Sequence, residues 1–258
     1  MDRLHNPFKH ALKSGRLQIG IWHSLSSPIA AEILADAGFD WILLDTEHAP
    51  NELPMVLAEL QAASGGTAHA VVRPAWNDAV IIKRLLDVGA QSLLIPYVET
   101  EEEAKRAVMS TRYPPAGFRG YAGQARASRY GRIKGYHAAA DAEICLLVQV
   151  ETKRGLENLE SIAAVEGVDG VFVGPGDLSA ALGFLGQPNH PEVVRIIEDM
   201  IQRIKRAGRA PGILTGDAEL AQRYIELGSL FAAVGSDIGL LRAADQLAAK
   251  FKSQNTGR

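Results

Sequence analysis

The run ICLLVQV, residues 144–150, is apolar at nearly every position and lies inside a chain of 258 residues. Apolar side chains at consecutive rather than alternating positions are typical of a strand that is covered on both faces. Such a strand belongs to a parallel sheet with helices packed outside it.

Seven further runs resemble it: LQIGIW from Leu17, DWILLD from Asp40, AHAVVR from Ala68, SLLIPY from Ser92, DGVFVG from Asp169, APGIL from Ala210 and FAAVG from Phe231. Amphipathic stretches separate the runs. Two of these stretches begin with helix-start signals at Ser26-Ser27-Pro28 and Asn77-Asp78, and are followed by Gly38 and Gly89. With no linker to divide the chain, the pattern predicts one (β/α)8 barrel domain over residues 1–258.

Two connections are much longer than the others. The first, roughly residues 112–141, contains PPAGFRGYAGQARASRYGR, and the second, roughly residues 174–191, contains GPGDLSAALGFLGQPNHP. Long loops in compact domains are more often functional than accidental. Arg119, Arg126 and Arg129 of the first fit either a mobile anion-binding lid or a subunit contact.

Composition excludes several classes of function. The chain has 27 Lys and Arg against 30 Asp and Glu, a net charge of −3, and no basic block that would suggest nucleic acid or anionic lipid as a partner. Its apolar runs are far shorter than the ~20 residues that cross a bilayer. Met1 to Arg16 lacks the apolar core of a secretory signal, so we expect a cytoplasmic protein. A single cysteine, Cys145, within an apolar run, is expected to be inert core.

Carboxylates follow two of the central runs. Because active sites of such barrels lie at the carboxyl ends of the strands, Glu151 after run five and Asp177 after run six are candidate ligands of a hard divalent cation. Gln149 shares a strand face with Glu151. The alternatives are structural: Glu151 in a salt bridge to a helix, and Asp177 as the cap of LSAAL.

Other strand ends carry further candidates. Arg73 suits a carboxylate or enolate oxygen, or else an inter-strand ion pair at the barrel rim. His48, three residues after Asp45, is either a general base held by that carboxylate or a solvated loop histidine. Lys153 is the one candidate for a Schiff base near a central strand.

The two aspartates that follow the seventh and eighth apolar runs favour a structural role over a catalytic one. Asp217 and Asp237 precede helical stretches and are expected to be N-caps. Capping carboxylates in these loops disfavour a phosphorylated substrate.

At these residues the chain resembles the HpcH/HpaI family of metal-dependent pyruvate aldolases, over roughly Asn6 to Lys250. The segments that carry the resemblance are GIWHSLSSP, FDWILLDTEHAP, VVRPAWND, LLDVGAQSLLIPYVET, YPPAGFRG, VQVETKRGLEN, VFVGPGDLS and VGSDIGLL. The lid sequence GYAGQARAS departs from the GxGxAL pattern of several relatives, so the aldehyde pocket is not carried over.

The resemblance implies a role for each matching residue. Glu151 and Asp177 would hold the metal, Mg²⁺, Mn²⁺ or Co²⁺, with Gln149 in support. Arg73 would contact the keto or enolate oxygen, and backbone amides around Gly176 and Asp177 would hold the substrate carboxylate. His48 with Asp45 would form the base region, Asp87 would reach that histidine from an adjacent subunit, and Trp22 and Leu214 would line the pocket.

The resemblance also implies an activity and an assembly. The activity is that of a class II aldolase joining a pyruvate or hydroxypyruvate enolate to an aldehyde, or cleaving the 4-hydroxy-2-oxo acid product. The assembly is a hexamer, built as a trimer of dimers, in which the last helix swaps between partners. Two alternatives are a citramalate or citryl-CoA type lyase, for which no basic nucleotide pocket is evident, and a barrel without turnover that serves assembly or ligand sensing.

Overall fold

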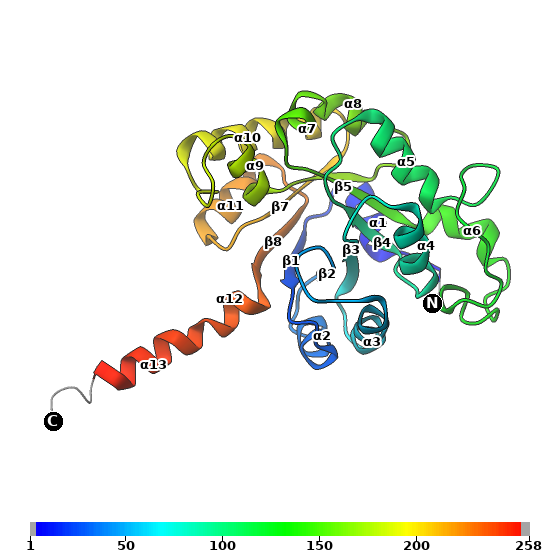
Figure 1. Cartoon of the computed structure of the whole chain (residues 1–258), viewed down its shortest axis with the longest axis horizontal. Helices are drawn as coiled ribbons and strands as arrows, with labels where there is room; N and C mark the ends of the chain where they lie inside the picture. Colours follow the sequence, from blue (N-terminus) through cyan, green and yellow to red (C-terminus); the bar gives the residue numbers. More distant parts are fainter. Residues whose placement is uncertain (1–3, 254–258) are drawn as a thin grey trace.

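The computed structural model describes residues 4–253, and its centre is a closed barrel of eight parallel strands that follow one another in chain order (Figure 1). The strands are β1 Gln18–His23, β2 Trp41–Asp45, β3 His69–Arg73, β4 Ser92–Ile95, β5 Cys145–Val150, β6 Gly170–Val173, β7 Ala210–Leu214 and β8 Phe231–Ser236. Each overlaps one of the apolar runs, and β1 pairs with β8 to close the barrel. The (β/α)8 prediction is confirmed.

Helices precede, connect and follow the strands. They are α1 Pro7–Lys13, α2 Pro28–Ala35, α3 Leu53–Ala63, α4 Ala79–Asp87, α5 Glu101–Thr111, η1 Arg126–Ser128, α6 Tyr136–Glu143, α7 Lys153–Glu157, α8 Leu159–Ala164, α9 Pro175–Ala181, α10 Pro191–Arg206, α11 Ala218–Leu227, α12 Asp237–Leu241 and α13 Ala243–Ser253. The expected starts are confirmed: Ser27 accepts a hydrogen bond from the Ala30 amide, and Asp78 accepts from the Val80 and Ile81 amides.

Helix α1 closes the amino-terminal end of the barrel. Phe8 packs against Trp41 and Phe231, with ring centroids 5.8 and 6.2 Å apart. The Lys9 ammonium, also buried, lies 3.3 Å from Asp169. The opposite end, where the strands have their carboxyl ends, is left to the loops that follow each strand.

The two long connections lie at different ends of the barrel. Residues 112–141 join α5 to β5, so they belong to the amino-terminal end, and Arg126 there donates to the Val88 carbonyl just after α4 (2.7 Å). A lid over this barrel's own mouth, one of the two interpretations of that segment, is therefore wrong. Residues 174–191 join β6 to α10, contain α9 and lie at the mouth.

The carboxyl-terminal helices leave the barrel. Figure 1 shows α12 and α13 as an arm that projects from the end of β8. Residues 238–252 are all exposed, and they include five large apolar side chains: Ile238, Leu240, Leu241, Leu247 and Phe251. Among the described helices, none combines the length and apolar character that a bilayer crossing requires.

Candidate active site

Glu151 and Asp177 meet at the mouth of the barrel through Tyr97. The buried Glu151 carboxylate accepts hydrogen bonds from the Tyr97 amide (Oε1, 3.0 Å) and from Gln149 Nε2 (Oε2, 2.5 Å). The Tyr97 hydroxyl donates to Asp177 Oδ1 (2.9 Å). Asp177 does not cap α9, whose N-cap is Gly174, so the structural alternative for Asp177 is wrong. The structure thus brings together the two carboxylates that the sequence singled out.

Tyr97 holds a backbone conformation that few non-glycine residues adopt. Its φ is +52°, and its ring packs on Trp76 with centroids 5.5 Å apart. Such conformations concentrate at functional sites, where the surrounding contacts maintain them. The sequence marked Tyr97 only as a polar residue at a strand end; its position between the two carboxylates is a finding of the structure.

A close backbone approach shapes the cradle around Glu151. A Cβ on Gly174 would lie 2.4 Å from Glu151 Oε2, so this position has no room for any side chain. Gln149 Oε1 is buried and has no hydrogen-bond partner among the described residues. Two carboxylates beside an amide oxygen with a free lone pair form an oxygen donor set of the kind that hard divalent cations prefer.

Glu47 adds a third carboxylate, which the sequence analysis passed over. It is nearly buried, and its Oε2 lies 2.7 Å from Arg73 Nη1. Burial raises the pKa of Glu47 to about 7, with the charges of Asp45 and Asp177 adding to the rise and that of Arg73 opposing it. Burial likewise raises the pKa of Glu151 to about 7, again with Glu47 and Asp177 contributing. The mouth therefore concentrates negative charge that a cation would stabilise.

Arg73 is held by Asp45 across two neighbouring strands. The two residues are register partners in β2 and β3; Nε donates to Oδ1 (2.9 Å) and Nη2 donates to Oδ2 (2.7 Å). The Trp22 ring lies 4.8 Å from the guanidinium carbon, and its Nε1 donates to Asp45. Burial alone would raise the pKa of Asp45, but the hydrogen bonds and charge of Arg73 hold it below its ordinary value. The inter-strand ion pair expected as the alternative role of Arg73 is present.

His48 lies apart from the Asp45 carboxylate. Its side chain is 61% exposed, and its Nε2 is 4.0 Å from Glu47. Asp45 Oδ1 accepts instead from the backbone amides of Glu47 (3.0 Å) and His48 (3.5 Å). The expectation that Asp45 holds the imidazole is wrong for this structure, because the carboxylate binds the loop backbone and Arg73. An exposed imidazole at the mouth remains available to a substrate.

Asp87 lies at the other end of the barrel. It is the last residue of α4, and helices of this fold run antiparallel to the strands that precede them. Its carboxylate lies 3.2 Å from Arg119 of the first insertion. Asp87 therefore does not meet His48 within one chain, and its contribution to an adjacent subunit stays a prediction.

A model of the family described as HpcH/HpaI aldolase/citrate lyase matches residues 18–244. The chain belongs to the HpcH/HpaI family. It is 56% identical to a 4-hydroxy-2-oxo-heptane-1,7-dioate aldolase of Klebsiella pneumoniae, over 98% of this chain and 96% of that one. A crystal structure of a family protein from Burkholderia cenocepacia superposes with a TM-score of 0.92 at 40% identity, covering 96% and 99% of the two chains. The crystal structure of an HpcH/HpaI aldolase from Desulfitobacterium hafniense superposes with a TM-score of 0.86 at 30% sequence identity. The match covers 96% of this chain and 97% of that one.

Gly176 and Leu214 lie together in this HpcH/HpaI mouth. Both line a cavity of about 570 Å³ between the loops after β6 and β7. Asp217 lines the same cavity and caps α11 by accepting from the Glu219 and Leu220 amides, as the sequence predicted.

Asp237 has a different role from the one expected. Ser236 caps α12, and the Asp237 carboxylate lies 2.7 Å from Nδ1 of His23, whose Nε2 is 3.0 Å from Glu59. Asn51 donates to the second Glu59 oxygen (2.8 Å). The N-cap prediction for Asp237 is wrong because the His23 imidazole, fully buried at the end of β1, requires both carboxylates as partners.

Of two further residues of this HpcH/HpaI chain, Cys145 follows expectation, whereas the position of Lys153 counts against the Schiff-base role for which it was a candidate. Cys145 is free and buried, and burial raises the pKa of its thiol well above the ordinary value. Lys153 begins α7 and is exposed, which does not favour the desolvated amine of a Schiff-base lysine.

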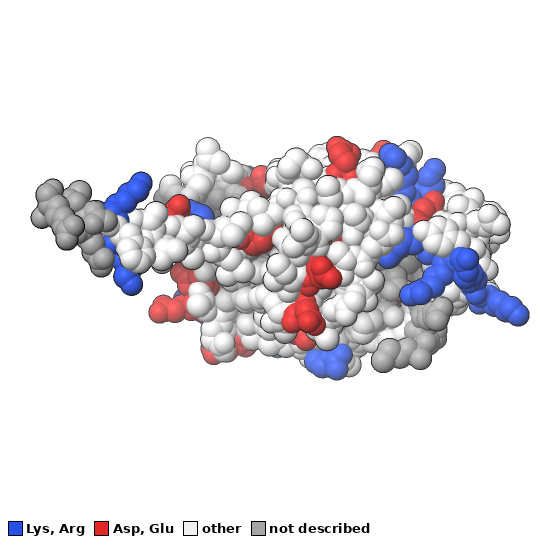
Figure 2. All heavy atoms as spheres, turned by 90° about the horizontal axis from the view of Figure 1, so that it is seen from below, with Lys and Arg blue, Asp and Glu red and all other residues white. Residues whose placement is uncertain are grey.

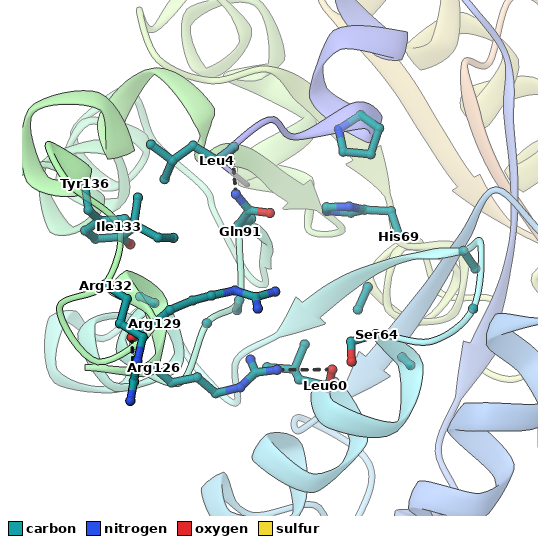
Figure 3. Close-up of a pocket in the computed structure, with 18 of the residues that line it drawn as sticks. Leu4, Leu60, Ser64, His69, Gln91, Arg126, Arg129, Arg132, Ile133 and Tyr136 are labelled. Atoms are coloured by element: carbon teal, nitrogen blue, oxygen red, sulfur yellow. Dashed lines mark hydrogen bonds between the residues drawn. The ribbon is translucent and has the colours of Figure 1, made fainter. Parts of the chain in front are cut away.

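A cavity larger than the one at the mouth lies at the opposite end of the barrel from the carboxylates. It measures about 680 Å³, and its lining includes Arg126, Arg129 and Arg132 of the first insertion together with His69 and Gln91 (Figure 3). Figure 2 shows Lys and Arg gathered at the end of the molecule where Figure 1 places this insertion. This basic cavity is separate from the mouth of its own barrel.

Proposed function

We propose that the chain is a divalent-metal-dependent class II aldolase that makes or cleaves 4-hydroxy-2-oxo acids. The donor would be the enolate of pyruvate or hydroxypyruvate, and the acceptor an aldehyde. The observation that carries the proposal is the pair Glu151 and Asp177, bridged by Tyr97 and lying near Glu47, which contacts Arg73. Family membership and relatives named as 4-hydroxy-2-oxo-heptane-1,7-dioate aldolases support it.

Glu151 and Asp177 would hold the metal, with Gln149 Oε1 and Glu47 beside it. An oxygen donor set of this kind accepts Mg²⁺, Mn²⁺ or Co²⁺. When bound, the metal would supply positive charge near the C2 oxygen of the donor. The raised pKa values of Glu47 and Glu151, both about 7, support a site built to face a cation.

Arg73 would stabilise the negative charge that develops on the same C2 oxygen. Its two hydrogen bonds to Asp45 occupy two of the five guanidinium N–H groups, which leaves one N–H group on Nη2 and both on Nη1, beside Glu47, for the substrate. Because Asp45 and Trp22 already hold the guanidinium, Arg73 loses little freedom when the charge forms. Backbone amides at Gly176 and Asp177 would hold the substrate carboxylate.

In the cleavage direction a base takes the proton of the C4 hydroxyl, and the C3–C4 bond breaks. The aldehyde leaves, and the electron pair of the broken bond remains on the three-carbon donor as its enolate, which then takes up a proton at C3. His48 is the candidate base because its imidazole is exposed at the mouth. Asp87 of an adjacent subunit would orient that imidazole.

The proposed assembly is a hexamer, a trimer of dimers, with the carboxyl-terminal arm swapped between partners. The exposed apolar face of α12 and α13 supports the swap, and the position of Asp87 at the amino-terminal end supports a site completed by a neighbour. Light scattering on the full chain tests the assembly. A six-chain mass is expected, and a monomer would contradict it.

An aldehyde panel with pyruvate and hydroxypyruvate as donors, with Mg²⁺ or Mn²⁺ added, tests the activity. Formation of 4-hydroxy-2-oxo acids is expected. Cleavage of a CoA ester in place of the free acid would favour the citramalate or citryl-CoA alternative; the basic cavity lies at the wrong end of the barrel to serve such a substrate within one chain. Pyruvate binding in calorimetry without any aldol product would favour a barrel without turnover.

A further inference from the structure

A second cluster of metal-ligand side chains lies far from the mouth, beside α1 at the amino-terminal end of the barrel. It consists of His5, just before α1, His10 within α1, and Glu143, the last residue of α6. One ligand atom from each lies within 4.8 Å of the others. His10 Nε2 is 3.1 Å from both Glu143 carboxylate oxygens, and the His5 ring stacks on the His10 ring with centroids 4.4 Å apart.

A buried residue holds the segments that carry these three side chains. Asn6 is fully buried, and its backbone amide donates to Glu143 Oε2 (2.7 Å). Its side chain donates to the Glu143 carbonyl (2.9 Å) and to Ser92 Oγ (3.0 Å), and accepts from the Lys9 amide as the N-cap of α1. Hydrogen bonds of this type, which orient a ligand from behind, are a regular feature of protein metal sites.

The donor chemistry differs from that of the mouth. Two imidazoles and a carboxylate form a set that suits Zn²⁺, whereas the all-oxygen set around Glu151 suits Mg²⁺ or Mn²⁺. Three protein ligands leave a fourth tetrahedral position for water.

We propose that His5, His10 and Glu143 form a second metal site, selective for Zn²⁺ or a similar transition ion, that ties α1 to α6. Because α1 closes the amino-terminal end of the barrel, an ion bound here stabilises the folded chain by mass action. The exposure of both histidines makes the site open to exchange with free metal. The site acts on stability and takes no part in the aldol chemistry.

The test removes the mouth site first, because Zn²⁺ competes well for oxygen ligands. Metal-free Glu151→Gln protein is titrated with Zn²⁺ by calorimetry, and one equivalent per chain is expected to remain. Adding His10→Gln or His5→Gln should lower the Zn²⁺ affinity of that site by at least about 10-fold. Loss of a residue that only supports a metal ligand already costs this much. His137→Gln, at a histidine outside the cluster, is the matched control and should leave it unchanged.

A second measurement separates binding from folding. Zn²⁺ should raise the unfolding temperature of the Glu151→Gln protein and not that of Glu151→Gln with His10→Gln, while the two metal-free proteins unfold at the same temperature. In the otherwise unaltered chain, His10→Gln should keep full Mg²⁺-supported activity. A Zn²⁺ equivalent that survives both histidine substitutions, or a stabilisation that His10→Gln leaves intact, would show that the cluster is a surface hydrogen bond only.

Discussion

Arg73 forks onto both carboxylate oxygens of Asp45, with Nε 2.9 Å from Oδ1 and Nη2 2.7 Å from Oδ2. The pair joins β2 to β3 at the mouth. Because the Asp45 carboxylate binds Arg73, it does not hold His48 as was expected. Asp45 is therefore a positioning residue for Arg73. Because Asp45 fixes the orientation of the guanidinium, the N–H groups that do not contact Asp45 keep a fixed direction. Oxyanion stabilisation requires donors that are oriented in advance in this way.

Asp45→Asn is expected to lower kcat by about 10- to 100-fold, because the neutral amide accepts only one of the two guanidinium hydrogen bonds. Arg73→Ala should cost at least about 100-fold, as loss of an oxyanion donor does. Steady-state kinetics with saturating metal and 4-hydroxy-2-oxo acid measure both. Asp217→Asn, a substitution at the cap of α11, is the control for a lost carboxylate at the mouth. Wild-type kcat in Asp45→Asn would remove the positioning role.

Tyr97→Phe is expected to weaken metal binding by about 10- to 100-fold, the usual effect of losing a residue that orients a ligand. The hydroxyl bond to Asp177 is lost, while the backbone amide that holds Glu151 stays in place. Activity measured against Mn²⁺ concentration should shift to higher metal and recover much of its maximum. A reduced maximum at an unchanged metal dependence would instead place the hydroxyl in the chemistry.

Gly174→Ala should abolish metal-supported turnover while leaving the barrel folded. The added methyl would lie 2.4 Å from Glu151 Oε2 and must displace that carboxylate. Gly176→Ala is a matched control for metal binding, because a Cβ there meets no atom within 4 Å. Circular dichroism and metal titration check the two variants. Tight metal binding by Gly174→Ala would show that Glu151 is not a ligand.

The buried His23 predicts how stability depends on pH. Although burial lowers the pKa of His23, its hydrogen bonds to Asp237 and Glu59 and their charges raise it to about 9. A pKa raised by folding adds stability that is complete below the unfolded value, ~6.5, and is lost as pH rises through the folded value. The free energy of unfolding should therefore fall between pH ~6.5 and 9, by up to about 3 kcal/mol.

Urea unfolding at several pH values across that window measures the effect. His23→Gln should be strongly destabilised at pH 7, because it leaves two buried carboxylates without a cationic partner, and it should lose the decline toward pH 9. Parallel pH profiles for the two proteins would show that His23 is neutral in the fold.

The sequence predicted what depends on local pattern. All eight strands follow from apolar runs, and Glu151, Asp177, Gln149 and Arg73 follow from their places at strand ends. The position of residues 112–141 could also be predicted from the sequence, because a connection from a helix to a strand always returns to the amino-terminal end of the barrel.

The remaining features depend on contacts between distant segments. His23, Glu59 and Asp237 come from three parts of the chain, so helix-capping rules placed Asp237 wrongly. In the sequence Glu47 resembles any other acidic loop residue, and only the fold brings its carboxylate to Arg73. The role of Tyr97 depends on its unusual φ, which the sequence does not reveal. His10 and Glu143 lie 133 residues apart, so no local pattern brings them together.

The most direct test of a metal-assisted enolate is exchange of the pyruvate methyl protons for deuterium, followed by proton NMR, since it needs no aldehyde. Exchange should stop on exhaustive chelation, return with Mn²⁺ and stay absent in Glu151→Gln at any Mn²⁺ concentration. Borohydride with pyruvate should leave the enzyme active. Exchange that persists without metal, together with inactivation by borohydride, would contradict the account and point to a Schiff base on a lysine such as Lys153.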